Sequence, residues 1–280
     1  MIYASTSCLK NPSDIIRVLN EYEKADIENV ELGSVHKYFE INKIKKFNFN
    51  FLIHNYFPPP KIPFNFNLAS SNKEIREKSY NLAIEAIDLC AEIESPLYTF
   101  HAGFTIDPPE LGTVFPKKGY TERNISIKTY VKSVEKILDF ANSNGVKIAM
   151  EPNVVQKFNL INGKNEMCLF AEIDEINQLF NLIKNKKLGI LLDLGHTAVT
   201  SHWLNFDKDE FVKKIKKKVF AIHISNNNGL ADQHKSLTKD CWHVTKLKNF
   251  KHVPIILETM NLTSEQIKSN IELAKKFTNK

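Results

Sequence analysis

Leu188-Gly189-Ile190-Leu191-Leu192-Asp193 is an almost continuous apolar run that ends in an acid. Ile255-Ile256-Leu257-Glu258, near the end of the chain, has the same form. Strands of a parallel sheet have this composition, because helices cover both of its faces and leave no alternation of polar and apolar residues. The two stretches therefore predict a parallel sheet in a protein of the α/β class.

Short apolar segments of this kind alternate with longer amphipathic stretches along the chain, which indicates repeated βα units. They number about eight, as in a closed parallel barrel. No linker-like change in composition divides the chain, so we expect one domain over residues 1–280, a single (β/α)8 TIM barrel. The predicted strands are Ile2–Ser5, Asn29–Leu32, Phe49–His54, Leu97–His101, Lys147–Glu151, Leu188–Asp193, Val219–Ile224 and Pro254–Glu258.

Capping sequences mark the ends of the predicted helices. Asn11-Pro12-Ser13-Asp14 offers an N-cap and a proline at the first helical position. Capping boxes are expected at Ser71–Glu74 and at Thr263–Gln266. Gly145 is expected to end a helix in the left-handed conformation.

The connections from strand to helix are longer than those from helix to strand. Gly145 leads directly into Val146, and Lys218 into Val219, whereas the long strand-to-helix segments are 55–70, 102–121, 152–168 and 225–239. Long ordered loops are uncommon without a function, and in barrels these loops build the active site. We therefore expect the site at the C-terminal ends of the strands.

The composition is that of a soluble globular protein, with 42% hydrophobic and 25% charged residues. No apolar run approaches the ~20 residues of a membrane span, and the N-terminus does not resemble a secretory signal. The four cysteines are far apart in the sequence, which predicts reduced thiols in a cytoplasmic protein. The net charge is +6, but the lysines between 213 and 218 predict a solvated helix face, so nucleic acid is not the expected partner.

Potential metal ligands recur where the predicted strands end. One such residue alone would be a helix cap, a salt-bridge partner or a structural histidine. Their recurrence at one end of a barrel predicts that they converge on a common site. They are Glu31, His54, His101, Glu151, Asp193, His223 and Glu258.

Charge indicates what this site holds. Glu151, Asp193 and Glu258 cannot all stay ionised within a few ångströms unless a proton or a cation neutralises them. Three carboxylates with the imidazole of His223 suit Mn²⁺, Zn²⁺, Co²⁺ or Mg²⁺. The sequence therefore predicts one divalent metal ion held by Glu151, Asp193, His223 and Glu258.

Six segments, in this order, resemble those of the xylose isomerase-like TIM barrels, which include sugar and sugar-phosphate isomerases and epimerases as well as type IV apurinic/apyrimidinic endonucleases. The resemblance covers most of the chain. In the isomerase and epimerase branch it implies that Glu151 and Glu258 exchange protons with the substrate through an enediolate, and that His54, His101 and His196 contact substrate. The segments are His101–Gly103, Ala149–Asn153, Leu192–His196, His223–Gly229, Asp232–His234 and Leu257–Thr259.

The endonuclease branch, which uses three zinc ions, also matches many positions, including Asp232 and His234. That branch is expected to take a zinc ligand from a histidine between His101 and Glu151, but residues 102–195 contain no histidine. The glycine-rich continuation after the Asp-x-His segment is also absent at Lys235–Thr238. The resemblance thus implies a three-ion set that is one ligand short, and the endonuclease activity is the second hypothesis.

Several alternatives stay open. Asp232 and His234 could hold a second ion together with His196, contact substrate, or organise a turn. A third hypothesis is a barrel that binds a sugar without transforming it. The expected partner is a small sugar or sugar phosphate; whether the chain also forms a homo-oligomer is open. Exposed cations in or beside the long loops could reach an anion. The Tyr56–Pro60 segment could form an apolar wall or lid, a stiff surface loop or a contact with another subunit. These cations are Lys117, Lys118, Arg123 and Lys235.

Overall fold

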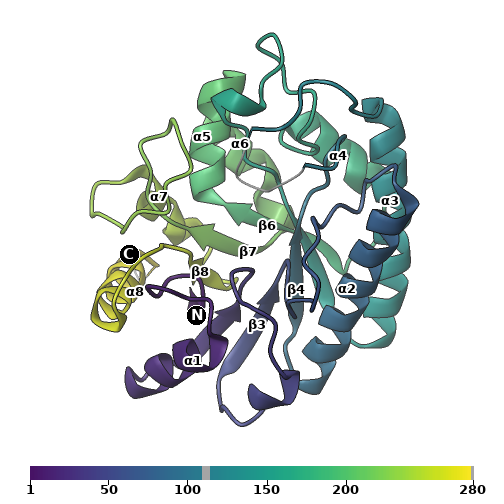
Figure 1. Cartoon of the computed structure of the whole chain (residues 1–280). Coiled ribbons are helices and arrows are strands. Elements are labelled where there is room, and N and C mark those ends of the chain that lie inside the picture. The colour runs from purple at the N-terminus through teal and green to yellow at the C-terminus, as the bar shows by residue number, and fades with distance from the viewer. Residues whose placement is uncertain (109–113, 279–280) are drawn as a thin grey trace.

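Eight parallel strands form a closed barrel in the computed structural model, which describes residues 1–108 and 114–278 (Figure 1). Each strand pairs with the next, and β8 returns to β1, so the barrel has no free edge. The predicted α/β class and TIM barrel fold are confirmed. The strands are β1 (Ile2–Ser5), β2 (Asn29–Leu32), β3 (Asn50–His54), β4 (Leu97–His101), β5 (Lys147–Glu151), β6 (Leu188–Asp193), β7 (Val219–Ile224) and β8 (Ile255–Leu257).

Six of the predicted strands have the predicted bounds, and two differ at their ends. β3 begins at Asn50, one residue later than predicted. β8 omits Pro254 and Glu258, although both flank the ladder: Pro254 O accepts from Ile222 N, and Glu258 N donates to Ile224 O. Proline has no N–H to donate, which explains why the strand begins after Pro254.

Helices surround the barrel, and the last one, α8, packs against β1 so that the chain ends lie close together (Figure 1). Short 3-10 segments supplement the helices at Ile41–Lys43, Lys157–Asn159, Lys216–Lys218 and Leu247–Asn249. The helices are α1 (Ile15–Lys24), α2 (Lys73–Glu92), α3 (Arg123–Ser143), α4 (Ile173–Leu182), α5 (Leu194–Leu204), α6 (Lys208–Ile215), α7 (Trp242–Lys246) and α8 (Ser264–Thr278).

Two predicted helix starts are displaced. Asp14 caps α1 by accepting from Ile16 N and Arg17 N, so Pro12 lies before the helix rather than at its first position. Asn72, not Ser71, caps α2. The capping box before α8 is confirmed, because Thr263 N donates to Gln266 Oε1 and Gln266 N donates to Thr263 Oγ1.

The structure also bears on the predictions for a helix end, the lysine run, the cysteines and membrane spans. Gly145 follows α3 with φ +74°, as expected of a left-handed cap. Lys213, Lys214, Lys216 and Lys217 are exposed, in agreement with a solvated face. None of the cysteines is in a disulfide. Among the described helices, none is long and apolar enough to cross a membrane.

The barrel interior is filled by its own set of apolar side chains, separate from the larger core between strands and helices. In the barrels of this class, side chains from the strands fill the interior in layers, so it is a packed core and not a pore. A ligand can therefore enter only at the end of the barrel. The interior set is Tyr3, Leu52, Leu97, Ala149, Leu191, Ala221 and Ile256.

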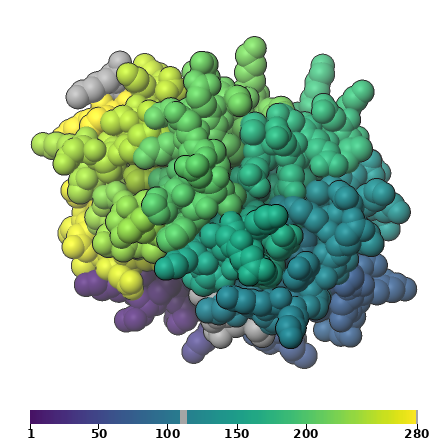
Figure 2. Space-filling view, turned by 90° about the horizontal axis from the view of Figure 1, so that it is seen from above, coloured from purple at the N-terminus to yellow at the C-terminus, as the bar shows by residue number. Residues whose placement is uncertain are grey.

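The long strand-to-helix connections lie at the C-terminal ends of the strands. They span residues 55–72, 102–122, 152–172 and 225–241, slightly longer than predicted. In the view from above, teal and green segments from the middle of the chain cover the centre of the molecule, and purple N-terminal residues lie at its lower edge (Figure 2).

Candidate metal centre

The barrel pleat places the candidate ligands on the inward face. Side chains two residues apart on a strand point to the same side. Ala149, Leu191, Ala221 and Ile256 fill the barrel interior, and the residues two positions later are the ones predicted to bind metal: Glu151, Asp193, His223 and Glu258. The apolar layer thus forms the floor of a polar layer at the C-terminal end.

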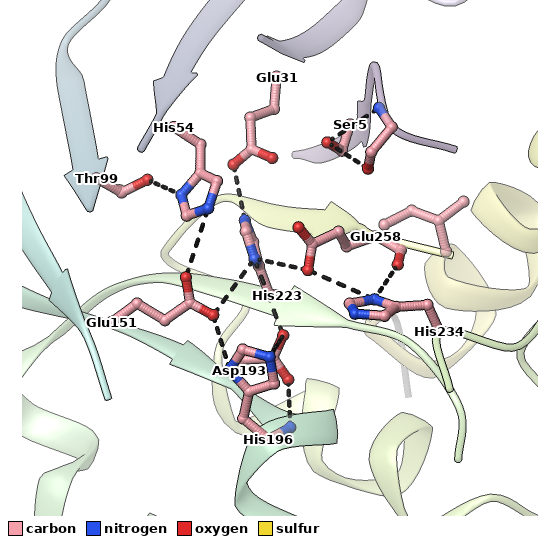
Figure 3. A network of polar contacts seen from close by, with 12 residues as sticks. Ser5, Glu31, His54, Thr99, Glu151, Asp193, His196, His223, His234 and Glu258 are labelled. Atoms are coloured by element: carbon pink, nitrogen blue, oxygen red, sulfur yellow. Dashed lines mark hydrogen bonds and ion pairs between the residues drawn. The ribbon is translucent and has the colours of Figure 1, made fainter. Parts of the chain in front are cut away.

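The three carboxylates of this set lie around one nitrogen of the fourth residue, His223 Nδ1. His223 Nδ1 lies 3.9 Å from Glu151 Oε1, 3.9 Å from Asp193 Oδ2 and 3.2 Å from Glu258 Oε2. Figure 3 shows His223 between Glu151 and Glu258, with Asp193 next to it. The structure therefore brings together side chains from four neighbouring strands, as their sequence positions predicted.

The facing atoms of this cluster make close ionic contacts but no hydrogen bonds among the described residues. Both carboxylate oxygens of Glu151, together with Asp193 Oδ2 and His223 Nδ1, are buried and have no hydrogen-bond partner within the described part of the chain. Buried polar atoms are rarely left unpaired unless they have a catalytic role or bind a water or an ion. Oxygen and nitrogen donors that face one another in this way fit a divalent cation.

Glu31 orients the imidazole of His223. The sequence indicated only that Glu31 is a potential ligand near a strand end, and it gave no sign of this role. Its Oε2 lies 2.7 Å from His223 Nε2, and both side chains are buried. With Nε2–H donating to Glu31, the Nδ1 lone pair would be available to a cation bound among the three carboxylates. Thr99 plays a similar part for His54, whose Nδ1 lies 2.9 Å from Thr99 Oγ1.

His54 and His101, predicted to contact substrate, approach the same carboxylate. His54 Nε2 lies 3.6 Å and His101 Nδ1 3.4 Å from Glu151 Oε2. Burial lowers the pKa of both histidines. They are therefore neutral at ordinary pH, which is the form of imidazole that binds metals.

His196, Asp232 and His234 form another group at the mouth of the barrel. Asp232 Oδ2 lies 3.2 Å from His196 Nε2 and 3.0 Å from His234 Nε2. His196 also reaches the first group, because its Nδ1 lies 3.0 Å from Glu151 Oε1. The loop that carries Asp232 does contain a turn at Gly229, but Asp232 and His234 point from it toward the other candidate ligands.

Three groups of potential ligands, with three residues each, can be chosen so that no residue belongs to two of them. The expectation that a three-ion set would be one ligand short is therefore not supported. His54 on β3, ahead of His101 in the sequence, could supply the additional ligand, which was expected after His101. The three groups are His54, His101 and Glu151; His196, Asp232 and His234; and Asp193, His223 and Glu258.

The electrostatics of the cluster show how its charge is balanced without a cation. Burial would raise the pKa of Glu258, but the adjacent His223 outweighs burial and holds that pKa at about 2. Burial would lower the pKa of His234, but the hydrogen bond to Asp232 and the charge of Glu258 raise it to about 10. Glu31 and Glu258 likewise hold the pKa of His223 well above its usual range, against the effect of burial. Protons on these imidazoles balance the carboxylates, and a bound cation would displace them.

A cavity of about 290 Å³ borders the cluster. Its polar side includes all five predicted substrate contacts: His54, His101, His196, Asp232 and His234. Glu258 also lines it, whereas Glu151, Asp193 and His223 lie beneath.

The Tyr56–Pro60 segment does not line this cavity, so the predicted apolar wall or lid is not found there. Phe57 is fully buried and packs against His36 and Phe39. Phe66, Phe104 and Phe115, from the loops after β3 and β4, form the apolar wall instead. Aromatic residues are common in all these loops, so the sequence held no signal to separate buried rings from lining rings.

Sequence relatives include DNA-repair enzymes. The chain is 29% identical to Apurinic-apyrimidinic endonuclease 1 of Plasmodium falciparum over 88% of this chain and 39% of that protein, so it spans well under half of that relative. It is 26% identical to Probable endonuclease 4 of Aquifex aeolicus over 78% of this chain and 73% of the relative. An uncharacterized protein of Methanocaldococcus jannaschii is 26% identical over 61% of this chain and 52% of its own length.

Solved structures with the same fold include sugar epimerases. A D-tagatose 3-epimerase-like protein superposes with a TM-score of 0.72, at 18% identity over 99% of this chain and 98% of the other. A D-psicose 3-epimerase of Clostridium cellulolyticum gives 0.64, at 10% identity over 99% of this chain and 95% of the other. These identities are low, and the likeness concerns the fold alone.

The family model described as "Xylose isomerase-like TIM barrel" matches residues 41–277, from before β3 to the end of α8. The match takes in each of the four residues that meet at His223 Nδ1. Together with the closed eight-stranded barrel, it establishes that this chain belongs to the xylose isomerase-like TIM barrel family.

Proposed function

We propose that the protein is a metal-dependent isomerase or epimerase of a small sugar. The observation that carries this proposal is the cavity of about 290 Å³, which is lined both by members of the ligand cluster and by phenylalanines. Pockets for small molecules start at roughly 300 Å³ and combine apolar walls with a few placed polar groups. A cavity of this size suits a monosaccharide.

Glu151, Asp193, His223 and Glu258 would hold one divalent cation, and His196, Asp232 and His234 could hold a second. The unpartnered oxygen and nitrogen atoms of the cluster support this assignment. When bound, the cation supplies positive charge that stabilises the enediolate formed as a proton leaves the carbon next to the carbonyl.

Two glutamates would move the proton. Glu258 lines the cavity, and its pKa of about 2 means that it is an ionised base at neutral pH. Glu151 lies on the other side of His223 (Figure 3), and both its oxygens lack hydrogen-bond partners within the described residues. One carboxylate would take the proton and the other would return one, either to the neighbouring carbon or to the opposite face.

The histidines would position the substrate. His196 Nε2 and His234 Nε2 are both held by Asp232 Oδ2, which fixes the two rings at the cavity wall. The nitrogens of both rings face protein oxygens, so the rings would bound the substrate by their carbon edges and faces rather than donate to it. His54 and His101 would bound the cavity on the side of Glu151.

The test is exchange of carbon-bound hydrogen with solvent deuterium, measured by mass spectrometry over a panel of ketoses and aldoses with the metal-loaded protein. Exchange is expected with at least one sugar, abolished by chelation, and nearly eliminated by Glu151→Gln and by Glu258→Gln. The exposed Glu77→Gln on α2 is the matched control and should retain full exchange. Near-normal exchange in both site variants would refute the two-glutamate mechanism. Sugar binding that is insensitive to chelation, without any exchange, would instead identify a non-catalytic binding protein.

Phosphodiester cleavage at abasic DNA is the second candidate. The three separate ligand groups favour it, as does the similarity to proteins named as apurinic-apyrimidinic endonucleases. The position of the lysine runs argues against DNA as the substrate. Lys216–Lys218 leads into β7, and Lys184, Lys186 and Lys187 lead into β6, so both runs lie at the N-terminal end of the barrel, opposite the site. DNA binding depends mainly on cations near the contacted phosphates.

Elemental analysis and a nuclease assay distinguish the two functions. The endonuclease predicts about three metal ions per chain and cleavage of a duplex with one abasic site, with strongly salt-dependent binding. The isomerase predicts no cleavage at any metal content. Cleavage by the wild-type chain that is lost in Glu151→Gln would overturn the leading proposal.

A further inference from the structure

We infer that this protein docks on an anionic lipid bilayer through the N-terminal ends of β5, β6, β7 and β8, at the end of the barrel opposite the candidate metal centre. That surface takes no part in the proposed chemistry, so the surface and the chemistry can be tested separately. Its charge, an exposed leucine and its position in the barrel favour this partner.

Lysines gather in the segments that lead into these four strands. The segments contain eight lysines and no aspartate or glutamate. Six of the lysines are exposed, and Lys187 and Lys218 are half-buried. Because the four strands are consecutive in the closed barrel, the segments are neighbours at one end of it. We call them the basic face; they are residues 144–147, 183–187, 216–218 and 250–254.

Lysine contacts join neighbouring parts of the basic face. Lys187 Nζ, in the segment before β6, donates to Asn142 O at 3.2 Å, near the end of α3 and the segment before β5. Lys218 Nζ, in the segment before β7, lies 2.9 Å from Asn177 Oδ1 on α4, the helix that leads to the segment before β6. These segments therefore form one surface rather than separate loops.

No acid neutralises the basic face. Lys213 and Lys246, just outside it, pair with Glu210 and Asp209. None of the eight lysines of the face forms an ion pair with a carboxylate of the described residues. An accumulation of one sign of charge attracts a partner of the opposite sign. The face is therefore complementary to a polyanion.

The other half of this barrel end has a different charge. The segments that lead into β2 and β4 carry exposed acids, and Lys45, before β3, is paired with one of them. An anionic surface would attract the basic face and repel these acids, which sets the orientation of the docked protein. The cavity at the C-terminal ends of the strands would then face away from the lipid. The acids are Asp26, Glu28, Glu92 and Glu94.

An exposed leucine beside the lysines favours a bilayer over a nucleic acid. Leu182 ends α4, directly before the β6 segment, and is 51% exposed. Such a side chain can enter the boundary between headgroups and acyl chains. Nucleic-acid contacts favour arginine forks and exposed aromatic rings instead. The basic face has no arginine, and the nearby Phe180 ring lies under the Lys218 ammonium, 4.5 Å from Nζ to the centroid.

Co-sedimentation of the full chain with lipid vesicles tests the inference. Vesicles of phosphatidylcholine alone are compared with vesicles that also contain phosphatidylserine, over a range of salt concentrations. We expect binding only to the vesicles with phosphatidylserine, and weaker binding as the salt concentration rises. No binding to these vesicles at low salt would overturn the inference and leave the proposed function intact.

A variant of four exposed lysines tests whether the basic face makes the contact. It combines Lys184→Gln, Lys186→Gln, Lys216→Gln and Lys217→Gln. Each lysine near an anionic membrane strengthens binding about fivefold, so the variant should bind about 100- to 600-fold more weakly. Should it fail to fold, the double variant with only the first two changes is expected to lose about 10- to 25-fold.

The matched control removes the same charge from the opposite end of the barrel. It changes four exposed lysines of the strand-to-helix loops to glutamine and should bind vesicles about as well as wild type. Equal losses in the two quadruple variants, or no loss in the variant of the basic face, would contradict docking through this face. The control positions are Lys117, Lys118, Lys235 and Lys239.

Leu182→Gln separates a bilayer from a nucleic acid. It should weaken vesicle binding about 3- to 10-fold, because a partly inserted leucine contributes apolar burial that glutamine does not. Duplex DNA and single-stranded RNA oligonucleotides are offered to the same proteins. Oligonucleotide binding that needs the four lysines and is unchanged in Leu182→Gln, together with no binding to vesicles, would overturn the bilayer as partner and identify a nucleic acid.

Discussion

Glu31 Oε2 and His223 Nε2 lie 2.7 Å apart, although 192 residues separate them in the chain. Glu31 is the last inward-facing residue of β2, and His223 is the last inward-facing residue of β7. The contact between them therefore crosses the inside of the barrel. Neither side chain is open to solvent. The carboxylate thereby sets the direction of the imidazole whose other nitrogen faces Glu151, Asp193 and Glu258.

Glu31→Gln should weaken metal binding by about 10- to 100-fold, because partners that orient a metal-binding histidine typically contribute that much. The variant keeps the shape of the side chain and removes its charge. Titration of the metal-free protein with Zn²⁺ or Mn²⁺ against a chromogenic chelator measures the affinity. Glu28→Gln, an exposed glutamate in front of the same strand, is the control. Equal affinities in both variants would show that Glu31 has only a structural role.

Removal of the metal should lower the melting temperature. A cation present at about 1,000 times its Kd stabilises the folded state by about 4 kcal/mol, which corresponds to a rise of roughly 8–16 °C. Calorimetry with excess metal and with excess chelator measures the difference, and Asp193→Asn should reduce it. The same melting temperature in chelator and in metal would mean that the ligand cluster binds no cation.

Gly103→Ala should destabilise the fold by about 1–3 kcal/mol, the usual cost of overpacking. A Cβ at this position would lie 2.6 Å from Ala69 Cβ and 2.9 Å from Asn67 Oδ1. The glycine therefore allows the loops after β3 and β4, which carry the phenylalanine wall, to approach each other. Urea unfolding measures the change. The double variant with Ala69→Gly should recover part of the lost stability, and a single variant as stable as wild type would contradict this close packing.

Acid should destabilise the protein partly through His36. Burial lowers the pKa of His36 to about 4, and its ring contacts Thr6 Oγ1 and Pro12 O, each at 2.7 Å. The unfolded chain has an ordinary histidine pKa of about 6.5, so between about pH 6.5 and 4 the unfolded state binds the extra proton and stability falls as the pH falls.

His36→Gln should therefore make the free energy of unfolding less dependent on pH in that window, by at most about 1.4 kcal/mol per pH unit. Chemical unfolding at a series of pH values, all in chelator, measures the slope. His252→Gln, which changes an exposed histidine, serves as the control. A slope equal to that of wild type would rule out the buried, neutral ring as a source of acid sensitivity.

The barrel could be predicted from the sequence because buried parallel strands consist of apolar runs, and Ile190–Leu192 and Ile255–Leu257 show this directly. The convergence of Glu151, Asp193, His223 and Glu258 was also predictable, because the C-terminal ends of barrel strands meet at one end. The contact between Glu31 and His223 was not, because it depends on which residues of β2 and β7 face each other across the barrel. The cavity wall also escaped prediction: Phe57 packs inward and Phe115 lines the cavity, and only the loop conformation decides between them.

Crystals grown with Zn²⁺ or Mn²⁺ and measured on both sides of the metal's absorption edge test the central claim most directly. An anomalous peak is expected among the side chains that meet at His223 Nδ1, at about 2.0–2.3 Å from ligand atoms of Glu151, Asp193, His223 and Glu258. Anomalous peaks only at other positions, or none at saturating metal, would contradict the account.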